Sequence, residues 1–160
     1  ENSVDGIFCS HVLEHLTYSD SLIALENTYK YLKNGGRFRM IVPDLSFYIN
    51  KYTMEKRNKN LKFKASKNFC EQTYLGEMDN RNFKTGIRNL FGGSKHLWMW
   101  DYESLKYTLT KVGFYKIKKF QKNNCNDKMF LKPERDHQFG SKSDDYGLAI
   151  ECFKPNNNKD

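Results

Sequence analysis

Near its beginning the chain reads Val4-Asp5-Gly6-Ile7-Phe8-Cys9-Ser10-His11. The apolar side chains of this stretch form a short run instead of alternating regularly with polar ones. Such a run is typical of a strand that is covered on both faces in a parallel sheet. The polar pair Ser10-His11 marks the end of the strand. The stretch therefore predicts an α/β fold in which residues 4–9 form one strand of the sheet.

A helix and a second strand follow at the spacing of a βαβ unit. Residues 17–20 have the spacing of a capping box, and apolar residues then recur at helical spacing up to Leu32. Gly35-Gly36 is expected to end this helix, because a left-handed residue is needed there. Residues 37–42 form the next strand, which Pro43 stops. This order predicts a right-handed crossover between two parallel strands.

The later part of the chain predicts both helices and strands. Asp101 is a good N-cap for a helix that Gly113 would end. Residues 121–145 are polar and show little periodicity, so a long loop is expected, with Arg135 and His137 exposed. The remaining predicted elements are helices at residues 47–54 and 65–75 and strands at residues 114–120 and 146–152.

The composition describes one folded domain with a thin core. Of the 160 residues 38% are hydrophobic. The usual apolar share of globular chains, roughly 45–50%, counts Gly instead of Tyr. The chain has ten of each, so its share on that count is also 38% and is low. The net charge is +8. The densest basic stretch, residues 51–67, carries no nucleic-acid-binding motif, so a solvated helical face is favoured over a phosphate-binding patch. No nucleic-acid partner and no membrane partner are expected.

The cysteines favour a reducing compartment. The chain has four of them and no C-x-x-C pair. Irregular spacing of this kind argues against a disulfide framework and against a zinc knuckle. A cytoplasmic protein with free thiols is therefore expected. The four positions are Cys9, Cys70, Cys125 and Cys152.

Two blocks of the sequence resemble class I S-adenosylmethionine-dependent methyltransferases of the type 11 kind. The first runs from Asp5 to Leu16 and continues through residues 32–38, where Leu-Lys-Asn-Gly-Gly stands for the family's Leu-Lys-Pro-Gly-Gly, and through Val42-Pro43-Asp44. The second covers residues 93–105 and ends with the Gly-Phe pair at 113–114. The order and spacing of the blocks make the resemblance specific.

The resemblance implies a truncated Rossmann-like methyltransferase fold. It covers strands four to seven with their flanking helices, in a mixed sheet whose last strand is antiparallel. The family holds the adenosine of its cofactor with a glycine-rich turn, and the chain contains no G-x-G-x-G. S-adenosylmethionine is thus the cofactor of the parent enzyme, and residues 1–160 alone are expected to bind it poorly. One domain is expected over residues 1–154, with residues 45–95 as a helical insertion or lid and residues 155–160 as a disordered tail.

The cofactor and the reacting groups are expected at the end of the first strand, because ligands of open α/β sheets bind beyond the carboxyl ends of the strands. By resemblance Cys9, Ser10 and His11 border the methionine end of the cofactor. His11 or His15 would act as general base, since an imidazole titrates near neutral pH. The alternative for either histidine is a structural role, capping or packing against the following helix.

Other residues are candidates for binding the methyl acceptor. Glu14 and Asp44 would lie at the same rim of the sheet, and Asp44 is favoured as the N-cap of the next helix over an acceptor ligand. By resemblance His96, Trp98 and Tyr102 cover the acceptor pocket or pack their loop against the domain.

His11-x-x-Glu14-His15 also matches an inverted zinc-protease motif. That chemistry needs a third, distant ligand. Since no ligand-bearing helix stands out in the sequence, no metal is expected.

The sequence thus predicts a methyltransferase that acts on a small-molecule or sugar-type acceptor. The alternative is a non-catalytic remnant of the fold that serves protein association. Residues 4–9 would form an exposed apolar edge strand, so a homodimer or higher oligomer through this edge is expected, with residues 3–12 at its centre.

Overall fold

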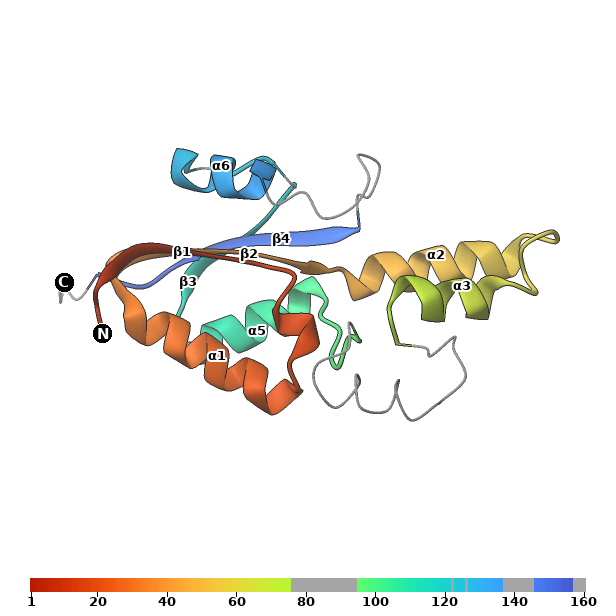
Figure 1. The fold of residues 1–160 in the computed structure, drawn as a ribbon, viewed down its shortest axis with the longest axis horizontal. Coiled ribbons are helices and arrows are strands. Elements are labelled where there is room, and N and C mark those ends of the chain that lie inside the picture. Colours follow the sequence, from red (N-terminus) through yellow and green to blue (C-terminus); the bar gives the residue numbers. More distant parts are fainter. Residues whose placement is uncertain (76–94, 122, 126, 137–145, 157–160) are drawn as a thin grey trace, which may run out of the picture.

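The computed structural model describes residues 1–75, 95–121, 123–125, 127–136 and 146–156, and the side chains of residues 135 and 136 are not described. The order of elements alternates strands and helices through most of the chain (Figure 1). The elements are β1 (Val4–Ser10), a short 3-10 helix η1 (Leu13–His15), α1 (Tyr18–Tyr31), β2 (Leu32–Pro43), α2 (Leu45–Arg57), α3 (Ala65–Gln72), α5 (Tyr102–Val112), β3 (Tyr115–Phe120), α6 (Lys128–Asp136) and β4 (Gly147–Phe153).

The described strands form one mixed sheet in the order β1-β2-β4-β3. β1 and β2 are parallel, with Ile7 beside Phe38 and Ser10 beside Ile41. β4 lies between β2 and β3 and is antiparallel to both. This arrangement confirms the predicted α/β class and the antiparallel last strand.

Local signals in the sequence fix the ends of several helices as predicted. The Thr17 hydroxyl accepts a hydrogen bond from the Asp20 amide at the start of α1. Asp101 and Ser104 form a reciprocal capping box at the start of α5. Gly113 ends α5 with a φ of 114°, a conformation that costs a glycine little because it has no Cβ.

The predicted end of α1 at Gly35-Gly36 is wrong. The helix ends at Tyr31, and Leu32 is already extended and wholly buried. Burying the Leu32 side chain in the core draws the backbone into β2 before the glycines are reached. Gly35 does have a positive φ, 74°, but it lies within β2 and not at the helix end.

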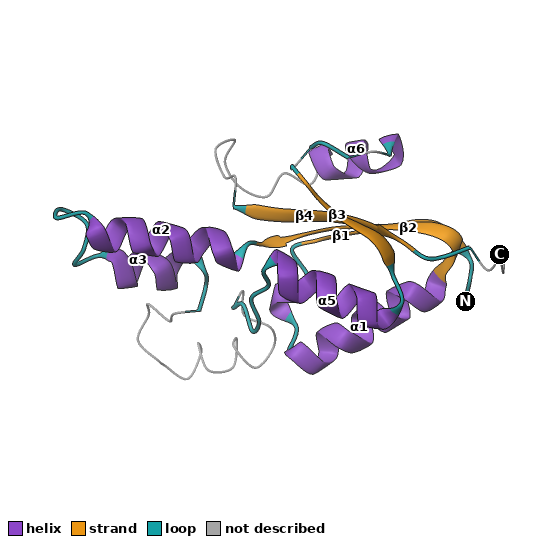
Figure 2. Ribbon diagram, turned by 180° about the vertical axis from the view of Figure 1, so that it is seen from behind, coloured by secondary structure: helices purple, strands orange, loops and turns teal. Residues whose placement is uncertain are grey.

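Helices α1 and α5 cover one face of the sheet, and the core lies between them and the strands (Figures 1 and 2). Alternate residues of β2 and β4 supply its centre, as the two-residue period of a strand requires. Thirteen buried residues form this cluster. They are Leu13, Leu25, Leu32, Phe38, Met40, Val42, Trp100, Leu105, Leu109, Phe114, Leu148, Ile150 and Cys152.

Helix α6 lies on the opposite face of the sheet, where the sequence predicts only a loop (Figure 1). Phe130 is buried against β1, and the centroid of its ring lies 6.5 Å from that of the Phe8 ring. Gly6 allows this close approach, since a Cβ at that position would lie 2.7 Å from the Met129 sulfur. The prediction of a loop over residues 121–145 is therefore wrong for residues 128–136, while residues 137–145, and with them His137, lie outside the described residues.

A buried ion cluster joins α6 to the sheet. Arg39 of β2 is wholly buried, and its guanidinium donates two hydrogen bonds to Glu134 of α6, at 2.9 and 2.8 Å. A third bond, of 3.1 Å, reaches Glu151 of β4. The cluster thus ties three elements together through one cation.

Helices α2 and α3 pack on each other and extend past the end of the sheet (Figure 1). They confirm the helices predicted at residues 47–54 and 65–75, although α3 already ends at Gln72. Residues 76–94 of the predicted insertion lie outside the described residues. The basic side chains at positions 56, 57, 59, 62 and 64 are exposed. In the described part of the chain no helix has the length and apolar character needed to cross a bilayer.

Candidate functional site

The candidate site begins where β1 ends. The His11 amide donates a hydrogen bond of 2.9 Å to the Ile41 carbonyl, which closes the pairing of β1 with β2. His11 then has a positive φ of 53°. This left-handed conformation turns the chain sharply into η1, and histidine tolerates it better than a bulky apolar residue does. The turn places Glu14 and His15 next to His11, as the sequence predicts for this rim.

Glu14 is the centre of the site. Its side chain is 1% exposed, and its Oε1 atom lies 3.2 Å from Nδ1 of His11 and 4.0 Å from Nε2 of His15. Its backbone carbonyl accepts hydrogen bonds from the amides of Leu97 and Trp98. Glu14 therefore holds the His11 imidazole, lies next to that of His15, and anchors residues 97 and 98 through its backbone carbonyl.

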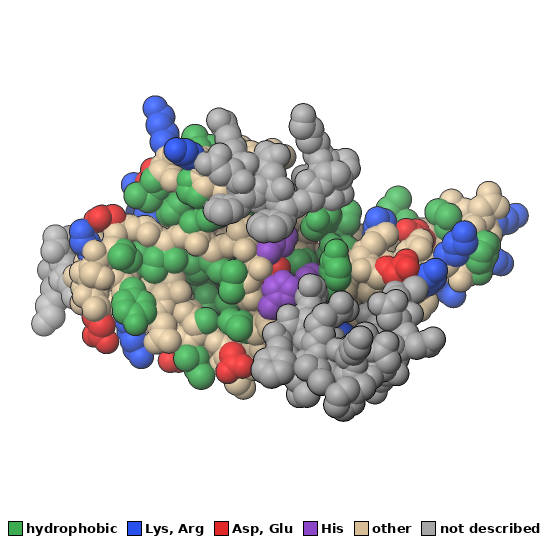
Figure 3. Space-filling model, viewed as in Figure 1, with side chains coloured by type: hydrophobic (Ala, Val, Ile, Leu, Met, Phe, Trp, Pro, Cys, Tyr) green, Lys and Arg blue, Asp and Glu red, His purple; other side chains and the backbone are tan. Residues whose placement is uncertain are grey.

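His15 and His96 lie side by side in an edge-to-face arrangement, with ring centroids 5.1 Å apart. His15 donates from Nδ1 to the Lys95 carbonyl at 3.0 Å. Burial lowers the pKa of His96, and the nearby Glu14 carboxylate opposes this effect only in part. His96 is therefore neutral near pH 7. Figure 3 shows histidine side chains gathered near the middle of one face of the molecule.

Aromatic rings border the histidines. The centroid of the Trp98 ring lies 4.8 Å from that of the Tyr18 ring and 6.1 Å from that of the Trp100 ring. Trp98 and Tyr18 are each 41% exposed, whereas Trp100 is buried. Trp98 was predicted for this site, but nothing in the sequence marks Tyr18 beyond its place in the first turn of α1. The two exposed rings offer an apolar surface beside the polar group around Glu14.

Two predicted acceptor-binding residues have other partners. The Asp44 carboxylate accepts from the Ser46 amide at 3.0 Å, so it caps α2, and it also pairs with Lys119 at 2.9 Å. The Tyr102 ring packs against the core, and its hydroxyl donates to the Ile117 carbonyl at 3.4 Å. The structure groups five predicted residues together, and Tyr102 is not among them. The group is His11, Glu14, His15, His96 and Trp98.

Cys9 and Ser10 lie at the end of β1, as predicted, and both are half-buried. Burial, followed by the charge of Glu14, raises the pKa of the Cys9 thiol to about 11. At neutral pH this thiol is protonated and is a poor nucleophile, since the thiolate is the reactive form. The Cys9 side chain therefore helps to line the rim, and it is a poor candidate for a nucleophile. All four cysteines are free, as expected.

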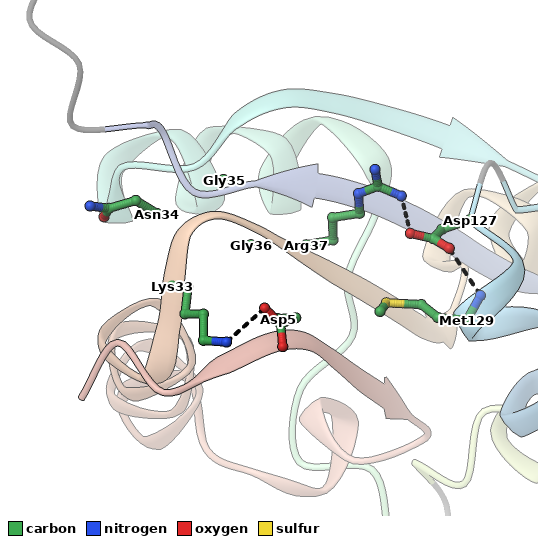
Figure 4. Close-up of a pocket in the computed structure, with 8 residues that line it drawn as sticks. All are labelled: Asp5, Lys33, Asn34, Gly35, Gly36, Arg37, Asp127 and Met129. Atoms are coloured by element: carbon green, nitrogen blue, oxygen red, sulfur yellow. Dashed lines mark hydrogen bonds and ion pairs between the residues drawn. The ribbon is translucent and has the colours of Figure 1, made fainter.

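A shallow hollow of about 270 Å³ lies at the other end of β1 and β2 (Figure 4). Its charged side chains form two pairs, Lys33 with Asp5 at 2.9 Å and Arg37 with Asp127. Since each of these charges has a partner, the hollow has no charged group free for a ligand. The rim around Glu14 is the stronger candidate.

The comparisons with known proteins agree with this fold. Residues 1–40 match the model of a family described as "Methyltransferase domain". The matched residues include β1, α1 and most of β2. The predicted resemblance to class I methyltransferases is thus confirmed over the segment that carries His11, Glu14 and His15. No curated protein matches the chain.

Several solved structures are similar in fold. A possible exported protein from Bordetella parapertussis is 9% identical with a TM-score of 0.51, and a SAM-dependent methyltransferase from Archaeoglobus fulgidus is 16% identical with a TM-score of 0.49. A SAM-dependent methyltransferase from Thermotoga maritima, a possible histamine N-methyltransferase, is 14% identical with a TM-score of 0.47. The match takes in 96% of this chain each time, but only 40%, 60% and 57% of those chains, respectively. The chain therefore spans only about 40–60% of the length of these structures.

Proposed function

We propose that these residues belong to an enzyme that transfers a methyl group from S-adenosylmethionine to a small-molecule or sugar-type acceptor, and that the transfer takes place at the carboxyl end of β1. One observation carries the proposal: a buried carboxylate holds two imidazoles beside an exposed tryptophan at the rim of the sheet. The match of residues 1–40 to a methyltransferase domain supports it. Cys9, Ser10 and His11 are the proposed neighbours of the cofactor's methionine end.

His11 is the first candidate for the general base. Methyl transfer is an in-line displacement, so the enzyme aligns the two reactants and removes the proton of a weakly nucleophilic acceptor. When Nδ1 of His11 is protonated, it donates to Glu14, and Nε2 then carries a lone pair for the acceptor's proton. Glu14 would stabilise the imidazolium that forms. His15 is the second candidate, since its Nδ1 donates to the Lys95 carbonyl and leaves the lone pair on Nε2.

Trp98 and Tyr18 support the sugar-type acceptor. Both rings are partly exposed and lie together, so they present an apolar face on which the C–H groups of a sugar ring can stack. The Trp98 amide donates to the Glu14 carbonyl. This bond brings the segment that carries Trp98 next to the polar side chains around Glu14, which can contact the sugar hydroxyls. His96 and Asp44 remain proposed acceptor contacts on the same side of the sheet.

A transfer assay with methyl-labelled S-adenosylmethionine tests this function. The parent enzyme, which by resemblance joins residues 1–160 to a glycine-rich cofactor-binding segment, is incubated with a panel of nucleotide sugars and simple glycosides and, separately, with amines and phenols. We expect label in a saccharide product. Label that appears only in amines or phenols would contradict the acceptor class, and transfer to no acceptor would favour the alternative function below.

A non-catalytic role in protein association is the second candidate, and the position of β1 favours it. Among the described strands β1 pairs with β2 alone, so its other edge is open. Val4, Ile7 and Phe8 on this strand are only half-buried. An apolar edge with one charged residue, Asp5, lacks the usual protection against strand pairing.

We therefore expect the 160-residue chain to form a homodimer in which two β1 strands pair antiparallel about a two-fold axis. Light scattering at increasing protein concentration measures the mass in solution. A mass twice that of one chain is the expected result. A monomer at high micromolar concentration would show that this edge does not associate.

A further inference from the structure

Three side chains of kinds that bind metals converge at the rim of the sheet. One potential ligand atom from each of Glu14, His15 and His96 lies within 4.8 Å of the other two. In a tetrahedral zinc site, bonds of about 2.0–2.2 Å place neighbouring ligand atoms about 3.3 Å apart. The observed group is therefore wider than a filled site by about 1.5 Å at most, which small side-chain rotations can close.

Two atoms of this group are buried and have no hydrogen-bond partner. They are Oε2 of Glu14 and Nδ1 of His96, and the two side chains belong to residues that are 1% and 9% exposed. Buried polar atoms normally have a partner, because leaving one unsatisfied costs free energy. A bound cation would satisfy both atoms at once.

The opposite sides of the imidazoles are held as metal-binding histidines usually are. His15 donates from Nδ1 to the Lys95 carbonyl, so Nε2 is the atom that carries the lone pair, and this atom faces Glu14. His96 has a hydrogen bond to the Thr73 backbone. Backbone carbonyls in this position fix the tautomer and the orientation of a metal-binding ring. His11 holds the other oxygen of Glu14, Oε1.

We propose that Glu14, His15 and His96 bind a divalent transition-metal ion, with Zn²⁺ as the metal that fits the donor set best. Two imidazoles and one carboxylate form a set that zinc uses when it keeps a fourth position open, whereas Ca²⁺ and Mg²⁺ prefer oxygen ligands. Glu14 and His15 are neighbours in the His11-x-x-Glu14-His15 motif. The third proposed ligand, His96, is distant in the sequence and lies next to them only in the folded chain.

The fourth position would take water or, if the proposed methyl transfer is correct, an oxygen of the acceptor. The side chain of His15 is 38% exposed, so the site is open to solvent on that side. A metal there would lower the pKa of a bound hydroxyl and so make it a better nucleophile. The binding of the metal itself does not depend on the proposed function.

A Zn²⁺ titration of the metal-free protein, in competition with a chromophoric chelator and without S-adenosylmethionine, tests the proposal. We expect one Zn²⁺ per chain, and we expect Glu14→Gln, His15→Asn and His96→Asn each to weaken binding by more than about 100-fold. The matched control is His11→Asn, which removes a histidine of the same motif that is not a proposed ligand. Because His11 only positions Glu14, it should weaken binding by about 10–100-fold, less than the loss of a ligand.

Thermal unfolding with and without Zn²⁺ separates loss of the site from loss of the fold, because a ligand stabilises only a folded protein that binds it. Zn²⁺ should raise the melting temperature of the wild type and of His11→Asn only. Should Glu14→Gln fail to fold, the two histidine variants decide. The proposal would be overturned if the wild type failed to bind stoichiometric Zn²⁺, or if His15→Asn and His96→Asn bound Zn²⁺ with the affinity of the wild type. Neither result would bear on methyl transfer.

Discussion

Replacing Arg39 by methionine is expected to lower the free energy of unfolding by about 3–5 kcal/mol. The guanidinium is wholly buried and is the cation for Glu134 and Glu151, whose side chains are 0% and 4% exposed. Removing it leaves two carboxylates close together at the interface of α6 with the sheet. Breaking a buried ion pair by deleting one partner is costly because the remaining charge loses its compensation. Urea denaturation measures the change.

Arg37→Met is the matched control, since Arg37 lies two residues away on β2 and pairs with Asp127 near the surface. The Arg37 side chain is 42% exposed, so solvent screens its pair and the expected loss is about 1 kcal/mol or less. Adding Glu134→Leu to Arg39→Met should restore part of the lost stability. Equal unfolding midpoints for the two single variants would show that the cluster does not hold α6.

Replacing His11 by asparagine is expected to lower the turnover of the parent enzyme by about 100-fold or more, the usual contribution of a general base. Asparagine is the suitable substitute, because it tolerates the positive φ that His11 adopts. The affinity for S-adenosylmethionine should fall much less than the turnover. A fall in kcat with little change in cofactor binding marks a group that acts mainly in the transition state.

Steady-state kinetics and a separate binding titration give the two quantities, and the melting temperature checks that the variant is folded. A variant with wild-type turnover would leave His11 with only its structural role at the end of β1. A variant that loses cofactor affinity and turnover in parallel would make His11 a binding residue instead of a base.

The sequence predicts those parts of the fold that depend on neighbouring residues. Thr17, Asp101 and Gly113 act within a turn of the helix that each one starts or ends, and all three do what the pattern indicates. The end of α1 is different, because the burial of Leu32 in the core decides it. A tertiary contact of this kind overrides the local preference of Gly35 for the left-handed conformation.

Helix α6 and its ion cluster illustrate what the sequence does not reveal. The segment is polar and contains Pro133, so its local pattern favours a loop. It is helical because Phe130 and Glu134 have partners on β1 and β2. The partners of Arg39 lie 95 and 112 residues further along the sequence. The local sequence around Arg39 therefore gives no sign that its side chain is buried.

The candidate site is predicted in part. The motif around Glu14 places two histidines next to one carboxylate, and the resemblance adds His96 and Trp98. Their meeting point depends on two hydrogen bonds from residues 97 and 98 to the Glu14 carbonyl, a long-range contact that no local pattern encodes. Asp44 shows the converse case, because its capping role follows from its position before α2.

Isothermal titration of S-adenosylmethionine into the parent enzyme tests the central claim most directly, because an association module has no need of this cofactor. The proposed function predicts saturable binding with a dissociation constant on the order of micromolar. It also predicts that Ser10→Trp, which adds a bulky side chain at the end of β1, abolishes the binding while the melting temperature shows that the variant is folded. No heat of binding in the wild type at millimolar cofactor, or unchanged affinity in Ser10→Trp, would contradict the claim that the cofactor lies at this rim.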